Sequence, residues 1–135
     1  MLAKQHRLTA PQDFSAVMRR GARAGTSTVV IAVLIRRSSS VQQLTTQAGR
    51  GWRCGFIVSK AVGNAVVRHR TTRRLRHIVR DLIESGGITL PQDAQCEIVI
   101  RALAESAMAD HPSLSADVAS GLRRAAVKAG GGPGP

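Results

Sequence analysis

The sequence predicts an α/β fold, a small mixed β-sheet packed with three helices in the order helix, strand, strand, helix, strand, helix. A β-branched apolar run over residues 26–35 is typical of a buried strand, and an amphipathic pattern over residues 64–85 is typical of a long helix. A third strand follows over residues 94–102, and then a last helix. Two helices after a mostly β middle indicate a ribosomal-protein-like two-layer sandwich, with the helices on one side of the sheet.

The first helix is predicted to begin around Thr9, whose hydroxyl can cap it while Gln12 reaches back from the third position. Pro11 fits the first turn, where its missing N–H costs little. Gly21 is expected to end this helix, and residues 19–23 are expected to form a basic linker.

The later elements follow from their flanking residues. Residues 38–51 are polar and small, which predicts a long flexible connection before a second strand over residues 53–59. Asn64 is expected to cap the long helix. Ser113 or Ser115 is expected to start the last helix.

The chain has 135 residues, enough for one domain with a modest core. Residues 1–129 are predicted to form that domain and residues 130–135 a disordered tail. No stretch approaches the ~20 apolar residues of a membrane span, and no signal peptide is evident. Cys54 and Cys96 lack Cys-x-x-Cys spacing, so buried thiols are expected. These features predict a cytoplasmic protein without a membrane partner.

The charge of the chain is unevenly distributed. It carries 20 lysines and arginines against 8 acids, a formal net charge of +12. Residues 14–80 hold 14 of the 20 basic residues and no acid, and residues 68–80 alone hold six arginines. Clustering of this kind indicates a polyanionic partner, for which nucleic-acid phosphate is the natural candidate.

At about 100° per residue, the predicted long helix separates into two faces. The apolar face gathers Val67, Thr71, Leu75, Ile78, Val79 and Leu82. The basic face gathers His69, Arg70, Arg73, Arg76, His77 and Arg80, with Arg68 at the apolar edge. Cations near a helix N-terminus and like charges without acids between them are both unfavourable. We therefore expect this face to bind phosphate, in preference to being a simply solvated charged surface.

A second anion-binding feature precedes this helix. Lys60 follows the end of a predicted strand, Gly63 can adopt unusual dihedral angles, and Asn64 starts the helix. Together they predict an anion site made of backbone N–H groups and a lysine.

No catalytic residue is predicted in the chain. Phosphodiester cleavage by magnesium needs closely set carboxylates, and the acid-free segment supplies none. The four histidines are scattered, and the arginines around His69 and His77 disfavour a metal or a shared proton. We therefore expect neither a catalytic centre nor a metal site in the protein.

The run S-K-x-x-G-N-A-V-x-R-x-R-x-x-R-x-x-R, from Ser59 to Arg76, resembles the signature of the bacterial ribonuclease P protein component. The segment L-x-x-x-x-D-F-x-x-V, from Leu8 to Val17, and the order of elements over residues 4–127 resemble that family too. The resemblance implies a protein subunit that binds a large catalytic RNA and assists endonucleolytic removal of the 5′ leader from precursor tRNA. It also implies a left-handed βαβ crossover, no obligate protein partner, and Mg²⁺ held mainly by the RNA subunit and the substrate.

Carried over by position, the resemblance implies two sets of contact residues. The RNA-binding set is Lys60, Gly63, Asn64, Arg68, His69, Arg70, Arg73, Arg76 and Arg80. The set that lines a cleft for the single-stranded leader is Phe14, Met18, Ala32 and Arg36. For Phe14, packing of the first helix on the sheet is an equally good interpretation.

The chain departs from the family pattern at several positions. His69 stands where asparagine is usual, and Met18 and Ala32 stand where aromatic residues are often found in the cleft. Trp52, expected in the loop before the second strand, either compensates for those aromatics or anchors the hairpin.

Two other functions stay open from the residues alone. One is a ribosomal or ribosome-assembly protein that binds structured RNA without a catalytic partner. The other is a double-stranded DNA binder with the arginine helix in the major groove, although no Asn or Gln follows Asn64 on that helix to read bases.

Overall fold

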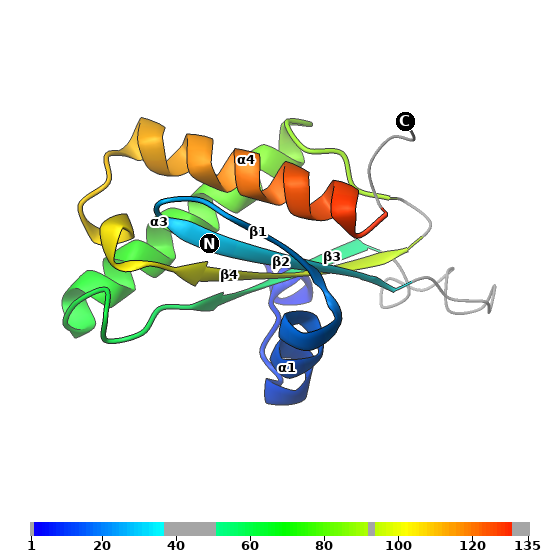
Figure 1. Ribbon diagram of the computed structural model, residues 1–135, viewed down its shortest axis with the longest axis horizontal. Coiled ribbons are helices and arrows are strands. Elements are labelled where there is room, and N and C mark those ends of the chain that lie inside the picture. The colour runs from blue at the N-terminus through cyan, green and yellow to red at the C-terminus, as the bar shows by residue number, and fades with distance from the viewer. Residues whose placement is uncertain (1, 37–50, 92–93, 131–135) are drawn as a thin grey trace.

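The computed structural model describes residues 2–36, 51–91 and 94–130. The predicted connection over residues 38–51 and the predicted tail over residues 130–135 lie outside them, except for Gly51 and Gly130. Figure 1 labels the elements. They are η1 (Lys4–His6), α1 (Pro11–Arg20), β1 (Ala22–Gly25), β2 (Val29–Arg36), β3 (Gly51–Ile57), α3 (Ala65–Glu84), β4 (Gln95–Ala102), η2 (Ala104–Ala107) and α4 (His111–Lys128).

The strands form one mixed sheet in the order β1-β2-β4-β3. β2 pairs antiparallel with β1 and β4, whereas β3 pairs parallel with β4. A parallel pair needs a crossover, which α3 provides between β3 and β4. The α/β class and the mixed sheet predicted from the sequence are confirmed.

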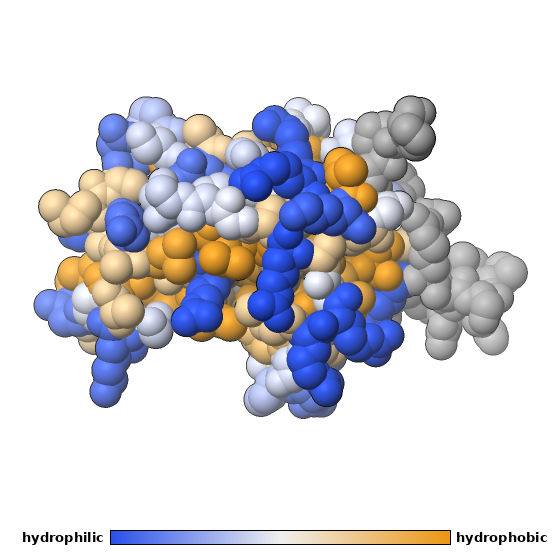
Figure 2. Space-filling view, in the orientation of Figure 1, coloured by the Kyte–Doolittle hydropathy of each residue, from blue (hydrophilic) through white to orange (hydrophobic). Residues whose placement is uncertain are grey.

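Helices cover both faces of the sheet, which corrects the expectation of helices on one side (Figure 1). α3 and α4 pack on one face around a core that includes Ile31, Ile98, Leu75 and Leu122. α1 packs alone on the opposite face, over a smaller cluster of buried residues. On the outside, hydrophilic side chains dominate over α4 and α1, and apolar residues show between them at the level of the sheet (Figure 2).

The prediction of a basic linker over residues 19–23 is wrong. Residues 19 and 20 still belong to α1, and residues 22–25 form the edge strand β1. Its pairing with β2 runs from Ala22 opposite Val33 to Gly25 opposite Val30. Lys128 Nζ from α4 donates to the Arg23 carbonyl at 2.9 Å. A four-residue strand has too few side chains to show a period of two, so its pairing partners, and not its pattern, decide its structure.

Two helix starts differ from the predictions. Ala10, not Thr9, is the N-cap of α1, and it makes no side-chain cap. α4 begins earlier than either predicted serine, because Asp110 Oδ1 accepts from the Ser113 backbone N–H at 2.8 Å. That backbone hydrogen bond lowers the pKa of Asp110, since it favours the charged carboxylate.

Both cysteines are buried thiols, as predicted. Burial without a charged partner raises the pKa of Cys54, because the thiolate is poorly solvated there. Among the helices of the described residues, none is both long and apolar enough to cross a membrane.

α1 packs over three residues that are aligned across the sheet, namely Ala32, Val99 and Gly55. Ala32 of β2 and Gly55 of β3 both face Val99 of β4 in the register. The Phe14 ring lies directly on Gly55, because a Cβ added there would come within 2.3 Å of Phe14 Cζ. Helix-to-sheet packing, one of the two interpretations of Phe14, is thus what the structure shows.

We expect Gly55→Ala to destabilise the protein by about 1–3 kcal/mol, because the added methyl group must displace the Phe14 ring. Urea denaturation measures the change. Gly25→Ala is the matched control: a Cβ there meets only Val30 Cγ2, at 3.9 Å, and should change the free energy of unfolding by less than about 0.5 kcal/mol. Equal effects at the two glycines would contradict the packing described.

Candidate nucleic-acid interface

The turn that leads into α3 is built as the sequence predicts. Asn64 Oδ1 caps the helix by accepting from the Val67 N–H at 3.0 Å. Gly63 has φ +154°, and a Cβ there would lie 2.9 Å from Val67 Cβ, so glycine is required. The Gly63 N–H is used within the turn, on the Lys60 carbonyl at 3.2 Å. An anion at this turn therefore depends on the exposed Lys60 and on the first N–H groups of the helix.

The two faces predicted for α3 are confirmed. Thr71, Leu75, Ile78 and Val79 are buried, and Val67 and Leu82 are half-buried beside them. On the other side, the exposed residues are His69, Arg70, Arg73 and His77, while Arg68, Arg76 and Arg80 are half-buried.

The arginines that begin this face have no protein anion. Within the described residues, no ion pair involves Arg68, Arg70, Arg73 or Arg76. Seven of the eight acids are among those residues; Asp93 is not. The face therefore presents net positive charge to solvent, which is the arrangement that favours binding of an external polyanion.

In the last turns of α3, by contrast, an acid lies beside the basic residues. Asp81 Oδ2 lies 3.1 Å from His77 Nε2, and Asp81 Oδ1 lies 3.9 Å from Arg80 Nε. Arg80 also lies 3.3 Å from His77 Nδ1. Asp81 thus partly neutralises the C-terminal end of the arginine face, and the positive charge is concentrated over residues 65–76 of α3.

Arg74 lies on the same helix but has a structural role. Its Nη2 donates to the Ala109 carbonyl at 2.7 Å, and its Nη1 donates to the Ser106 carbonyl at 3.4 Å. Both acceptors lie in the segment between β4 and α4. Arg74 therefore ties α3 to that segment, and its guanidinium group is used inside the protein.

The four residues predicted to line a leader cleft lie around α1. Phe14 and Met18 are half-buried on α1, against the small core on that face of the sheet. Ala32 is only 1% exposed beneath the helix, so its side chain is not available to a ligand. Arg36 lies farther along β2, where it pairs with Glu97.

Glu97 is a site residue that the sequence reasoning missed. It is 1% exposed, and its Oε1 and Oε2 each lie 2.5 Å from a guanidinium nitrogen, Arg36 Nε and Arg53 Nη2 respectively. One carboxylate thus holds two arginines that leave a net charge of +1. The sequence signal that could have found it is a single acid inside an apolar strand. A buried charge needs charged partners, so such an acid predicts an ion pair within the fold.

Trp52 does not compensate for the missing cleft aromatics. It lies inside β3 instead of in a loop, and it packs against the core under α3 and α4, on the face away from α1. Its ring stacks on His6 with centroids 4.0 Å apart, and His6 Nδ1 lies 2.8 Å from the Trp52 carbonyl oxygen. Of the two interpretations of Trp52, the structure supports the anchoring one.

A crossover helix that presents unpaired arginines beside a mixed sheet defines an α/β nucleic-acid-binding domain. The comparisons make the class specific. The family model described as Ribonuclease P matches residues 2–126. The Ribonuclease P protein component of Nocardia farcinica is 40% identical and covers 100% of this chain and 90% of its own length. The Ribonuclease P protein component of Corynebacterium jeikeium is 43% identical, and the match covers 93% of this chain and 98% of that protein.

Solved structures show the same fold. The RNase P protein of Staphylococcus aureus superposes with a TM-score of 0.66 at 18% identity, covering 89% of this chain and 94% of that one. The RNase P protein from Thermotoga maritima gives a TM-score of 0.64 at 20% identity, and the match covers 87% of this chain and 96% of that one. The chain belongs to the family of bacterial ribonuclease P protein components. It is therefore the protein subunit of a tRNA-processing ribonucleoprotein, and the ribosomal and DNA-binding alternatives are set aside.

Proposed function

We propose that the protein binds the ribonuclease P RNA through residues 65–76 of α3 and binds the 5′ leader of precursor tRNA along the α1 face of the sheet. The observation that carries the proposal is the absence of any protein anion against Arg68, Arg70, Arg73 and Arg76 within the described residues. Guanidinium groups held in a row on a rigid helix suit a phosphate backbone, which displays its charges at regular intervals.

The leader contact is proposed for a smaller set than the sequence predicted. Met18 and the edge of Phe14 offer apolar surface on α1, and Arg36, with 40% of its side chain exposed, offers charge on β2. Ala32 is left out because α1 covers it. A single strand can place bases on the apolar surface and phosphates on the arginine, which is the usual combination for such ligands.

We propose that the cleavage chemistry belongs to the RNA subunit. Residues 65–76 of α3 offer Mg²⁺ no carboxylate ligand, so the ion is assigned mainly to the RNA and the substrate. The protein contributes charge neutralisation and positioning. The buried thiols Cys54 and Cys96 support a cytoplasmic location.

Reconstitution tests the function directly. Protein freed of RNA should not cleave precursor tRNA in magnesium, whereas protein combined with the organism's own ribonuclease P RNA should release the 5′ leader at low magnesium faster than the RNA alone. Gel analysis of end-labelled precursor measures both. Cleavage by nuclease-treated protein would place the catalytic centre in the chain, contrary to the proposal.

Arg73→Ala or Arg76→Ala should weaken binding to the RNA subunit and flatten its salt dependence. Each lost phosphate contact should reduce the slope of log affinity against log salt by roughly 0.7–0.9. Filter binding between 50 and 200 mM salt, about the range over which such contacts act, gives the slope.

Arg74→Ala is the matched control, since it removes the same charge from the same helix. It should leave the slope nearly unchanged, and it should lower stability by about 1–3 kcal/mol because two backbone carbonyls lose their donor. A slope that falls equally in Arg73→Ala and Arg74→Ala would show a general charge effect instead of phosphate contacts.

Glu97→Gln tests the leader contact through the sign of its effect. The change removes one negative charge and so raises the net charge of the protein by one. Long-range electrostatics alone therefore predict tighter binding of every RNA. We expect instead weaker binding of precursor tRNA, with mature tRNA little affected, because Arg36 loses the carboxylate that positions it. Glu105→Gln adds the same charge at an exposed site and is the control. Tighter binding by both variants would remove Arg36 from the leader contact.

A further inference from the structure

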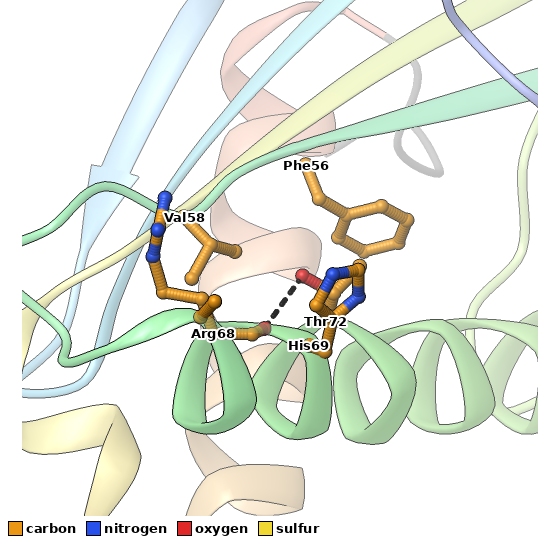
Figure 3. A pocket seen from close by; sticks show the side chains of 6 residues that line it. Phe56, Val58, Arg68, His69 and Thr72 are labelled. Atoms are coloured by element: carbon orange, nitrogen blue, oxygen red, sulfur yellow. Dashed lines mark hydrogen bonds between the residues drawn. The ribbon is translucent and has the colours of Figure 1, made fainter.

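A pocket of about 250 Å³ opens between the end of β3 and the first turns of α3. It is lined by Phe56 and Val58 from the strand side and by Ala65, Arg68, His69 and Thr72 from the helix. In Figure 3, Phe56 points from the strand toward the helix, and His69 and Thr72 point from the helix into the same space. Among the described residues β3 is an edge strand of the sheet, with β4 as its only paired neighbour.

The lining has the chemistry of a site for a flat heterocycle. Phe56 and Val58 are half-buried and give the pocket an apolar wall, whereas His69 is exposed and lies at its open side. An aromatic ring and an imidazole offer stacking surfaces to any base, because every base has a π-face. The volume lies below the roughly 300–1,000 Å³ of sites for drug-sized ligands, so one ring system fits better than a larger cofactor.

The hydroxyl group of Thr72 can recognise the edge of that ring. Thr72 Oγ1 donates to the Arg68 carbonyl at 3.0 Å, so the proton of this hydroxyl is already used and its lone pairs are left to accept (Figure 3). Arg68 Nε is buried and is without a hydrogen-bond partner in the described part of the chain. Its guanidinium group lies beside Val58 and away from Phe56 and His69 in Figure 3, so no contact with the base is assigned to it.

The pocket also lies where an RNA chain would pass. His69 and Arg73 are four residues apart on α3, about 6 Å along the helix axis. A nucleotide chain whose phosphates contact Arg70 and Arg73 therefore runs past the mouth of the pocket. Phosphate contacts alone carry no base information, whereas a pocket beside them admits a base that is not stacked in a duplex.

We propose that this pocket, lined by Phe56, His69 and Thr72, binds a single unstacked nucleobase of the RNA subunit, with an amino group of the base directed at Thr72. The proposal rests on the proposed function, since it requires RNA on the arginine face. It assigns His69 a stacking role, distinct from the phosphate contacts of its arginine neighbours.

The test separates stacking from charge by salt titration at pH 8, where ordinary imidazoles are neutral. His69→Ala should lower affinity for the ribonuclease P RNA roughly 5- to 100-fold at every salt concentration, with an unchanged slope, because stacking releases no counterions. His69→Phe keeps a flat ring and should restore most of the affinity. His111→Ala removes an exposed histidine of α4, outside the pocket and off the arginine face, and should change little.

A second pair of variants blocks the pocket without removing a contact. Ala65→Leu places a larger side chain in the pocket and should reproduce the loss seen with His69→Ala. Val66 is 74% exposed and does not line the pocket, so Val66→Leu should bind RNA as the unmodified protein does.

The outcomes distinguish this proposal from the proposed function. A reduced salt slope in His69→Ala would make His69 a phosphate contact and overturn the base site. Normal affinity in His69→Ala and Ala65→Leu, with weak binding in Arg73→Ala, would overturn the base site and leave the proposed function intact. Normal affinity in Arg73→Ala as well would overturn both.

Discussion

The packing of α3 on the sheet is the constraint on which the rest of the protein depends. Leu75, Ile78 and Val79 are buried on one side of the helix, and this anchors its orientation about its own axis. Because one side is fixed, Arg70 and Arg73 on the other side cannot turn toward the protein's own acids. The positive charge therefore stays on the surface as an ordered row. Burial of apolar side chains, a non-directional effect, thus creates a directional electrostatic feature.

The sheet supports this helix at both ends. The β3 strand leads into the Gly63-Asn64 turn, and β4 receives the chain after the helix, so the parallel β3–β4 pair fixes where α3 lies. Arg74 holds the helix to the segment before α4. The same arrangement leaves the space between Phe56 and His69 open beside the arginines. Charge and a base-sized pocket are therefore adjacent on one rigid unit, which favours recognition of RNA that carries an unstacked base.

The opposite face of the sheet follows a different principle. There the arginines are held by a buried acid: Glu97 positions Arg36 and Arg53 through two short contacts. Glu97 thus leaves these three side chains with a net charge of +1 and holds the two guanidinium groups in a fixed geometry. In the function proposed above, the α3 face attaches the large RNA through salt-dependent contacts, and the α1 face contacts a single strand.

The sequence by itself determined the elements whose signals are local and repeated. The two faces of α3 follow from a period of 3.6 residues, and the Asn64 cap and the glycine before it follow from capping chemistry. The buried strands β2 and β4 follow from short, mostly apolar runs. The arginine row could be predicted as well, because the arginines and the absence of acids can be counted directly along residues 68–80. Only the tertiary structure decided what depends on residues far apart in the chain. Strand β1, the position of α1 on the second face, the burial of Ala32, the pairing of Glu97 and the pocket at Phe56 are contacts between distant segments. Neither spacing nor composition records such contacts, because their energy comes from neighbours that the folded chain brings together.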